Sequence, residues 1–272
     1  MLKKIEKSRI FLEENIVSLR CPICHDAFSL SGNSLICEKK HTYNLNKKGS
    51  INFLKKTADT EHYTRKMFEP RRRLIQAGMY GGLLAAIQPN LTGSSLLDVG
   101  TGEGSFLQLL PFNGSKFAFD IANDGIEMAT DLDVSAFLAL ADLTNLPFAD
   151  QSMSTILNIL TPSNYAEFKR VLMPNGRLIK VLPDKFYLRE LREAYEMPVE
   201  HDNSAVIANF AKEFPDFKQT ELFYKFTLPE DLRLDFLAMS PLEWSASEEV
   251  KSKAVLNSPK KATIHMQLLI SN

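Results

Sequence analysis

The sequence predicts an α/β protein in which helices cover an open, Rossmann-like parallel sheet, with a small β domain ahead of it at the N-terminus. Short apolar runs typical of buried strands alternate with helical stretches from residue 95 onward, and the first of these runs ends in a glycine-rich turn. All three cysteines lie ahead of this alternation, between residues 21 and 37. A chain of 272 residues is long enough for one large domain and one small one.

The N-terminal domain is expected to hold a metal ion. Residues 1–20 predict only an extension that packs on the rest of the chain, through residues such as Phe11, Leu12 and Val17. Two close pairs of metal-ligand types come next, C-x2-C and C-x3-H, with twelve residues between them: Cys21, Cys24, Cys37 and His41. Two such pairs are what tetrahedral Zn²⁺ requires, and four protein ligands leave no open position, so the zinc is expected to be structural.

The segment between the two pairs, residues 28–36, predicts a β-hairpin with Gly32-Asn33 at its tip. This hairpin favours His41 over the nearby His25 as the fourth ligand. The alternative is three free cysteines beside a surface histidine. A disulfide framework is not indicated, because the number of cysteines is small and odd.

Positive charge is concentrated between residues 39 and 73. This segment has eleven lysines and arginines against three acids, a local charge of +8, so the chain of net charge −1 carries −9 elsewhere. Such a separation indicates an anionic partner, and four aromatic residues there could stack on unpaired RNA bases: Tyr43, Phe53, Tyr63 and Phe68. The alternative is an ordinary solvated face whose aromatic side chains turn to the core. The candidate RNA-binding residues are Lys39, Lys40, Lys47, Lys48, Lys55, Lys56, Arg71 and Arg72.

The stretch from Ser95 to Phe106 predicts a strand, a glycine-rich turn and the start of a helix. Its glycines are spaced G-x-G-x-G, whereas a dinucleotide site has G-x-G-x-x-G. Asp98, just before the glycines, suits a ligand that carries an amino group and a sulfonium cation. The stretch resembles the first motif of class I methyltransferases that use S-adenosyl-L-methionine (SAM), and the resemblance implies that SAM is held by Asp98, Gly100, Gly102 and Gly104. The alternative is a structural glycine turn in another α/β domain.

Carboxylates follow at the ends of the next two predicted strands. Asp120 stands at the end of residues 116–121, where a carboxylate accepts the two ribose hydroxyls of a nucleotide ligand. Asp142, followed by Leu143, ends the strand over residues 136–141 and is placed to accept from the adenine amino group. Acids at successive strand ends behind a glycine loop favour a cofactor site over solvated caps.

The fourth strand, residues 153–160, leads into the segment from Asn158 to Tyr165, where we expect the pocket for the methyl acceptor. Asn164 is the candidate catalytic-site residue, for binding the target base. Covalent methylation at C5 of a pyrimidine needs a cysteine outside the zinc module, and the chain has none. Exocyclic-amine methylation uses an Asn/Asp-Pro-Pro-aromatic run, which Thr161-Pro162-Ser163-Asn164 does not match.

The rest of the chain predicts the remaining parts of the sheet. A helix over residues 167–172 and a loop at 174–176 precede a fifth strand at 177–182. Residues 188–216 are mostly helical. Two alternating stretches, 219–226 and 263–270, predict an antiparallel pair that closes the sheet.

These features together resemble the RlmA (RrmA) family, class I SAM-dependent methyltransferases that act on N1 of a guanine in 23S rRNA. The resemblance covers nearly the whole chain after Arg20. It depends on the zinc ligands, on the glycine loop and on shorter motifs: Gly49-Ser50-Ile51-Asn52-Phe53-Leu54, Arg72-Arg73, Gly78-Met79-Tyr80, Leu146-Pro147-Phe148, and Met239-Ser240-Pro241 with Trp244.

The resemblance implies an activity, partners and further site residues. It implies N1-methylation of a guanine in a hairpin loop of 23S rRNA, with the zinc domain recognising the rRNA, and it implies a homodimer. It places four residues at SAM-contacting positions: Tyr80, Gly102, Glu103 and Tyr187. The family often has cysteine and histidine where this chain has Thr101 and Tyr187.

We therefore expect three segments: an N-terminal extension with a zinc-binding RNA-recognition module (1–56), a helical linker (57–90) and a SAM-dependent methyltransferase domain (91–272). A cytoplasmic protein without a membrane partner is expected, because no apolar run reaches the length of a membrane span and the first twenty residues lack a signal-peptide core. The alternative functions are a SAM-dependent small-molecule or protein methyltransferase whose zinc ribbon docks a partner, and a non-catalytic SAM-binding RNA chaperone.

Overall fold

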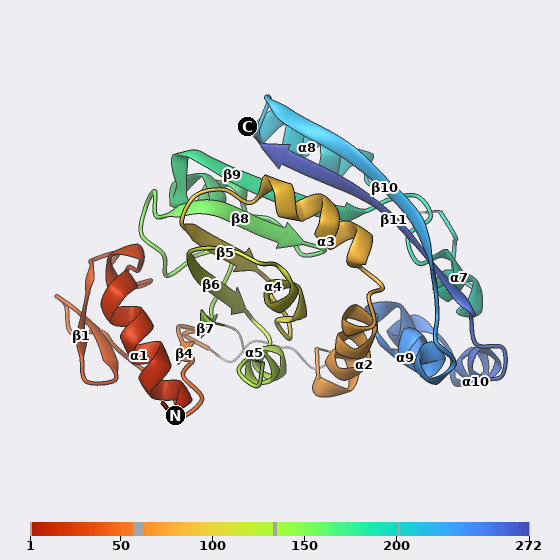
Figure 1. Ribbon diagram of the computed structural model, residues 1–272, viewed down its shortest axis with the longest axis horizontal. Coiled ribbons are helices and arrows are strands. Elements are labelled where there is room, and N and C mark those ends of the chain that lie inside the picture. Colours follow the sequence, from red (N-terminus) through yellow and green to blue (C-terminus); the bar gives the residue numbers. More distant parts are fainter. Residues whose placement is uncertain (1, 57–62, 133–134, 201, 272) are drawn as a thin grey trace. The chain divides into compact units, whose positions relative to one another are not determined.

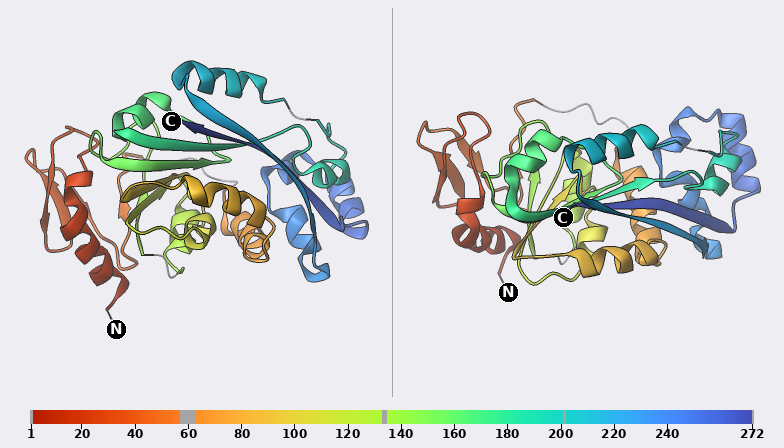
Figure 2. Two further views of the ribbon diagram at one scale, coloured as in Figure 1. Left: turned by 45° about the horizontal axis from the view of Figure 1, so that its top comes forward. Right: turned by 90° about the horizontal axis from the view of Figure 1, so that it is seen from above.

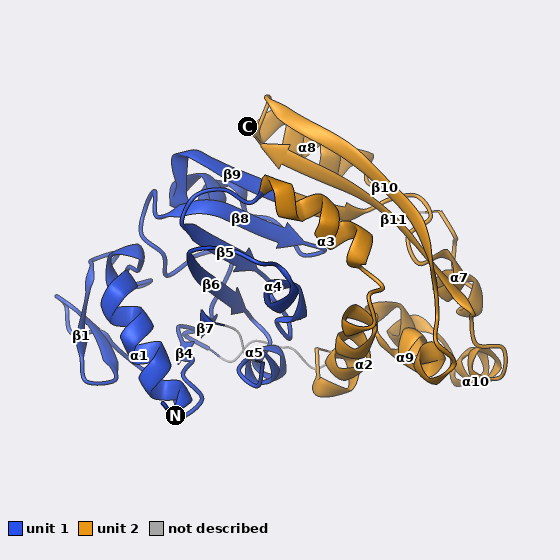
Figure 3. Ribbon diagram, in the orientation of Figure 1, with its two compact units in different colours: residues 1–60, 91–179, 272 blue, residues 61–90, 180–271 orange. Residues whose placement is uncertain are grey.

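The computed structural model describes residues 2–56, 63–132, 135–200 and 202–271 (Figure 1). The chain divides into two compact units (Figure 3). Unit 1 comprises residues 1–60, 91–179 and 272, and unit 2 comprises residues 61–90 and 180–271. The predicted linker begins with residues 57–62, which lie outside the described residues, and its remaining part belongs to unit 2.

Unit 1 is built on a sheet with the strand order β9-β8-β5-β6-β7-β4. Its strands are β4 (Ile51–Asn52), β5 (Ser95–Val99), β6 (Ser115–Asp120), β7 (Ala136–Leu140), β8 (Met153–Ile159) and the first part of β9 (Leu172–Pro183). The strands from β8 to β4 pair in parallel, and every residue of β5 and β8 is buried. Because parallel strands end at the same edge, the segments after β5, β6, β7 and β8 lie along one side of this sheet.

Helices connect these strands in the order that the sequence predicts. They are α4 (Ser105–Leu109) after β5, α5 (Asn123–Ala129) after β6 and α6 (Tyr165–Val171) after β8. The predicted α/β fold is confirmed. The loop predicted at residues 174–176 is wrong, because these residues lie within β9. A Cβ on Gly176 would stand 2.8 Å from the Leu172 side chain, so the chain bends there without leaving the strand.

The N-terminal part of unit 1 forms a second, three-stranded antiparallel sheet, β1-β2-β3. Its strands are β1 (Phe28–Ser31), β2 (Ser34–Cys37) and β3 (Thr42–Asn44). Gly32 lies at the tip of the β1–β2 hairpin with a φ of +59°, and Ser31 pairs with Ser34, which confirms the predicted hairpin. We call residues 19–56 the zinc lobe.

The N-terminal extension forms α1 (Lys4–Asn15) and the short helix η1 (Ile16–Ser18), and it packs on unit 1. Leu12 is fully buried, and the ring of Phe11 lies 5.2 Å from that of Phe117 on β6. The expectation for Val17 is wrong, because this side chain is 83% exposed. A three-residue helix turns it away from the core that α1 covers.

Unit 2 has two long antiparallel strands, β10 (Phe217–Thr227) and β11 (Lys261–Ser271), which run side by side (Figure 2), and β11 adjoins β9. Its helices are α2 (Arg65–Gln76), α3 (Gly81–Ile87), α7 (Arg189–Ala194), α8 (Ser204–Glu213), α9 (Arg233–Ala238) and α10 (Glu248–Leu256), with short turns η2 (Gln88–Asn90), η3 (Glu230–Leu232) and η4 (Pro241–Ser245). Within the described ranges, no helix is both long and apolar enough to span a bilayer.

Candidate cofactor and metal sites

The glycine-rich turn after β5 is held by the end of β6. Gly100, Gly102 and Gly104 all have positive φ, at +66°, +56° and +83°, a conformation that suits glycine. The Gly102 N–H donates to the Asp120 carboxylate at 2.7 Å, and the neighbouring N–H at position 101 donates to the Phe119 carbonyl at 3.0 Å. The turn is therefore fixed against the strand that carries Asp120.

Two of these glycines are also required by close packing. A Cβ on Gly100 would stand 2.4 Å from Thr161 Oγ1, in the segment after β8. A Cβ on Gly104 would stand 3.0 Å from the Cβ of Ala129 at the end of α5. The turn thus fits between the loop after β8 and the helix after β6, with no room for a side chain at Gly100 and little room at Gly104.

The four predicted acids lie on or beside this edge of the sheet, in different surroundings. Asp98 and Glu103 are buried. Glu103 accepts from the N–H and the hydroxyl of Ser105, at 3.2 and 2.6 Å, and so holds the start of α4. Asp120 also accepts from the N–H at position 122 at 2.8 Å. Asp142 is exposed, and one of its oxygens accepts from the N–H and the hydroxyl of Thr144, both at 2.8 Å.

This arrangement fits the polar and cationic groups of SAM. Buried carboxylates are stabilised by a ligand with positive charge. Each carboxylate has about four acceptor positions, so Asp120 and Asp142 can accept from a ligand beyond the bonds that they already make. Thr101 Oγ1 is buried and has no hydrogen-bond partner in the described residues. Thr101 is not among the residues predicted to bind SAM, and its burial without such a partner is what marks it as a further candidate.

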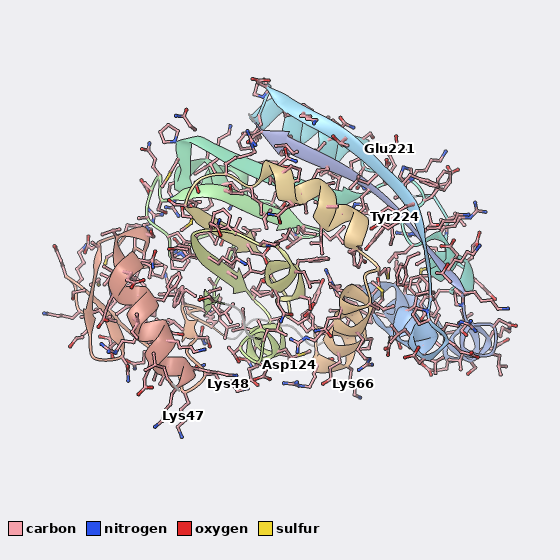
Figure 4. The ribbon with its side chains drawn as sticks, viewed as in Figure 1. Lys47, Lys48, Lys66, Asp124, Glu221 and Tyr224 are labelled. Atoms are coloured by element: carbon pink, nitrogen blue, oxygen red, sulfur yellow. The ribbon has the colours of Figure 1, made fainter. Side chains whose placement is uncertain are left out.

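Leu143, the predicted SAM contact next to Asp142, is half-buried. Two further predicted SAM contacts, Tyr80 and Tyr187, belong to unit 2 and lie together there. Their hydroxyl oxygens are 2.7 Å apart, and both side chains are buried. Burial raises the pKa of both phenols above the usual value, so they stay neutral. Tyr224 on β10 (Figure 4) donates to the Met79 carbonyl at 3.1 Å, next to this pair.

The structure brings the four predicted zinc ligands together. The ligand atoms of Cys21, Cys24, Cys37 and His41 all lie within 4.8 Å of one another. Cys24 Sγ and Cys37 Sγ are 3.4 Å apart, and His41 Nδ1 lies 3.5 and 3.4 Å from the sulfurs of Cys21 and Cys37. A tetrahedral Zn²⁺ with its usual bond lengths separates two sulfurs by about 3.8 Å and a sulfur from a nitrogen by about 3.5 Å. The cluster therefore fits zinc, and His25 is not part of it.

A second group of ligand types in the described part of unit 2 does not fit a metal ion. It consists of Asp184, Glu221 on β10 and His265 on β11. The Phe186 N–H donates to His265 Nδ1 at 3.2 Å, so the neutral ring carries its proton on Nε2. That Nε2 faces Glu221 at 2.8 Å and Asp184 at 3.1 Å, and it donates to them instead of offering a lone pair to a metal.

The loop after β8 is fixed by a buried asparagine. Asn158 donates to the Pro162 carbonyl at 2.9 Å and accepts from the Ser163 hydroxyl at 2.7 Å, and Leu160 between them has a φ of +55°. Asn164 follows as the cap of α6, with its Oδ1 accepting from the Glu167 N–H at 3.2 Å. The Asn164 amide nitrogen makes no hydrogen bond within the described ranges.

The predicted RNA-binding residues occupy both units. Five of the lysines are exposed on unit 1: Lys39, Lys40, Lys47, Lys55 and Lys56. Lys48, beside Lys47 (Figure 4), is half-buried, and its Nζ lies 3.6 Å from Glu127 Oε2. The two arginines, Arg71 and Arg72, are half-buried on α2 of unit 2.

Two of the four aromatic residues turn to the core, as the alternative expected. Phe53 and Phe68 are buried, so base stacking is wrong for them. Tyr43 is half-buried, with its ring 4.8 Å from that of Phe53. Tyr63 is 44% exposed and packs edge-on against Trp244.

Comparison with known proteins agrees with this geometry. The family model for the N-terminal domain of RlmA matches residues 19–56, and a methyltransferase-domain model matches residues 97–180. YxjB of Bacillus subtilis (strain 168), named for 23S rRNA (guanine-N1) methyl transfer, is 35% identical over 274 residues, covering 92% of this chain and 95% of YxjB. The chain belongs to the RlmA family.

Other relatives of this RlmA-family protein carry the same kind of name. The 23S rRNA (guanine(748)-N(1))-methyltransferase of Streptomyces fradiae is 27% identical over 262 residues, covering 91% of this chain and 94% of that protein. Among solved structures, the YcgJ protein from Bacillus subtilis aligns with a TM-score of 0.47 and 16% identity, over 70% of this chain and 95% of that chain. The segment that matches the RlmA N-terminal model is the zinc lobe, and the segment that matches the methyltransferase-domain model runs from β5 to β9.

Proposed function

We propose that this protein transfers a methyl group from SAM to N1 of a guanine in a hairpin loop of 23S rRNA. One observation carries the proposal. Unit 1 contains both a Cys3His cluster of zinc dimensions and a glycine turn flanked by acids at successive strand ends. Relatives with matching segments along nearly their whole length are named for this reaction.

The SAM-binding residues are proposed to divide their roles along the sheet edge. Asp98, Gly100, Gly102, Glu103 and Gly104 surround the amino-acid end of the ligand, with Tyr80 and Tyr187 as further contacts. Asp120 accepts from the ribose, and Asp142 with Leu143 binds the adenine. This order follows the strand order β5-β6-β7, because each acid stands at the end of its own strand.

When bound, SAM would supply a methyl group on a positively charged sulfur and would leave as a neutral thioether, and the guanine N1 proton would pass to a base or to water. The task of the protein is to align the two reacting atoms. Alignment alone lowers the activation free energy by several kcal/mol, about 7–11 kcal/mol in the best cases.

The target base is proposed to enter beside the loop after β8. A base in a hairpin loop is splayed out at little cost, because it is already partly unpaired. Asn164 does not accept the guanine N1 proton, because its side chain is a neutral amide. Its Nδ2 donors suit the guanine O6 next to N1, because its Oδ1 already caps α6.

The zinc lobe is proposed to bind the rRNA backbone. Lys39, Lys40, Lys47, Lys48, Lys55 and Lys56 supply positive charge on unit 1, and Arg71 and Arg72 supply it on α2. Contacts from such residues to phosphates position the RNA and make the affinity dependent on salt. By family resemblance we also propose a cytoplasmic homodimer, which light scattering of the purified protein would test.

The decisive experiment offers labelled SAM to unmodified 23S rRNA and, separately, to a protein extract. We expect label in one guanine, mapped by mass spectrometry to N1. Asp98→Asn, which removes a charge but keeps the side-chain shape, should abolish transfer, whereas the exposed Asp231→Asn should not. Label only in protein or in a metabolite, or SAM binding without any transfer, would refute the proposal in favour of an alternative function.

A further inference from the structure

We infer that the zinc turn, residues 20–26, is a positioning element of the SAM and base sites as well as part of an RNA-binding lobe. Four residues that were not predicted as site residues make the connection: Arg20 within the turn, and Asn145, Asp150 and Arg170 beyond it. The inference rests on the proposed function, which places adenine at Asp142 and the target base at the start of α6. All of these residues belong to unit 1.

The first connection is a short backbone ladder. The Arg20 N–H donates to the Pro147 carbonyl at 3.1 Å, and the N–H at position 149 donates to the Ser18 carbonyl at 2.9 Å. Leu19 pairs with Phe148 between these two bonds, and both side chains are buried. The chain just before the first zinc ligand is therefore paired with the segment that follows the predicted adenine site.

The second connection comes from the residues between the first two zinc ligands. Asn145 Nδ2 donates to the carbonyl of Pro22 at 2.5 Å. The backbone N–H of Asn145 in turn donates to the Asp142 carbonyl at 3.1 Å, and Thr144 is bonded to the Asp142 carboxylate. Asp142 and Asn145 are thus the two ends of one turn. One end carries the proposed adenine acceptor, and the other is bonded to the zinc turn.

The third connection is a chain of charged groups that reaches α6. Arg20 and Arg170 both donate to Asp150 Oδ1, at 3.0 and 2.9 Å. Arg170 also makes a two-pronged pair with Glu167, at 2.8 and 2.6 Å, and Glu167 accepts from the Leu146 N–H at 2.7 Å. Burial by itself would raise the pKa of Glu167, but the bonds from Arg170 hold it below the usual value.

Three of these four charged side chains are shielded from water, whereas Asp150, which joins the two arginines, is 64% exposed. The side chains of Arg20, Arg170 and Glu167 are only 15%, 17% and 14% exposed. Charge pairs in such surroundings are sensitive to the loss of one partner, unlike pairs on the surface. Glu167 lies in the first turn of α6, whose cap is Asn164, so the network fixes the helix start where the target base is proposed to bind.

This arrangement differs from a zinc lobe that acts as an independent RNA-binding module. An independent lobe would leave residues 142–150 and the affinity for the cofactor unchanged when the metal is lost. The three connections instead predict that loss of zinc loosens this segment and weakens cofactor binding, even without RNA.

The test uses the full chain and S-adenosylhomocysteine as the probe. Asn145→Ala removes the bond to Pro22 without touching a zinc ligand, and Cys24→Ser removes the metal. Asn33→Ala is the matched control, since Asn33 is an exposed asparagine of the zinc lobe at the hairpin tip. The measurements are zinc content, dissociation constants by calorimetry, and amide hydrogen exchange of residues 142–150.

We expect Asn145→Ala to keep its zinc, to exchange faster over residues 142–150 and to bind the probe roughly threefold to tenfold more weakly, the range for one lost hydrogen bond. Cys24→Ser should weaken binding at least as much, and the double variant should be no weaker than Cys24→Ser alone, because both changes break the same connection. Asn33→Ala should match the wild type.

Unchanged exchange and affinity in Asn145→Ala would overturn the inference, whatever Cys24→Ser does. Faster exchange without weaker binding would also overturn it, because the segment would then not support the cofactor. Additive losses in the double variant would show that the two changes act separately, which would overturn it as well. Failure of the wild type to methylate 23S rRNA would refute the proposed function, but it would leave these binding and exchange results intact.

Discussion

Replacing Gly100 by alanine tests whether the glycine turn and the loop after β8 fit together as one site. The residue has a φ of +66°, and its missing side chain faces Thr161. An added Cβ would lie 2.4 Å from Thr161 Oγ1 and 2.9 Å from Thr161 Cβ, whereas ordinary contacts begin near 3.4 Å. The loop after β8 must therefore retreat by roughly 1 Å, which is a typical misfit of an overpacked core.

The expected cost has two parts. A left-handed conformation costs alanine about 1–2 kcal/mol, and overpacking costs about 1–3 kcal/mol more, so Gly100→Ala should lose about 2–5 kcal/mol of unfolding free energy. Gly32→Ala is the matched control, because Gly32 has a φ of +59° with nothing within 4 Å of the added Cβ. It should lose only the first part, about 1–2 kcal/mol.

The assay combines urea unfolding with calorimetric titration of S-adenosylhomocysteine. Gly100→Ala should weaken binding at least about tenfold, equivalent to 1.4 kcal/mol, whereas Gly32→Ala should leave it unchanged. Adding Thr161→Gly to Gly100→Ala removes the crowded atoms and should recover the packing part of the loss. Equal destabilisation in the two alanine variants, with unchanged binding in both, would refute the reasoning.

Three further predictions use other parts of the molecule. Tyr187→Phe removes the hydrogen bond between the Tyr80 and Tyr187 hydroxyls, whose oxygens are 2.7 Å apart, and should cost about 0.5–1.5 kcal/mol in urea unfolding. Tyr80→Phe should then cost less in this variant than in the wild type, because the shared bond is already lost, and equal costs in both would contradict the prediction. Burial lowers the pKa of Lys180 from 10.5 to about 8, so the unfolded chain holds this proton more tightly and the protein should become more stable as the pH rises from about 8 to 10.5. Lys180→Met should remove this rise in melting temperature, and an unaltered pH profile would count against the prediction. Lys47→Ala should reduce the slope of log affinity for 23S rRNA against log salt by about one, but the exposed Lys218→Ala should not.

Much of the fold follows from patterns between near neighbours in the chain. The strand before Gly100 is recognisable because the short apolar run Leu96, Leu97 and Val99 precedes a glycine turn, and all five residues of this strand are buried in the structure. The hairpin tip at Gly32 and the break between α2 and α3 are marked by glycines with positive φ. The loop expected at residues 174–176 was wrong because a proline and a glycine predict a turn, whereas packing of Leu172 over Gly176 bends the chain within β9.

The aromatic residues of the basic segment show where composition stops being informative. The positive charge of residues 39–73 is compatible both with aromatic side chains that stack on RNA bases and with aromatic side chains that pack in the core. Phe53 is buried because β4 joins the edge of the main sheet, where the Phe53 N–H donates to the Leu140 carbonyl at 2.8 Å. Nothing near Phe53 in the sequence indicates a strand partner almost ninety residues farther along the chain.

By itself, the sequence determined the chemistry that the protein can offer: the zinc ligand set, the glycine turn and the acids at the strand ends. Each of these depends on residue type and on spacing over a few positions, which local backbone geometry preserves. The tertiary structure alone decided that Thr161 closes over Gly100 and that Asn145 and Asp150 hold the zinc turn. Those partners lie 61 to 130 positions apart, so only the packing of buried strands and shielded charges brings them into contact.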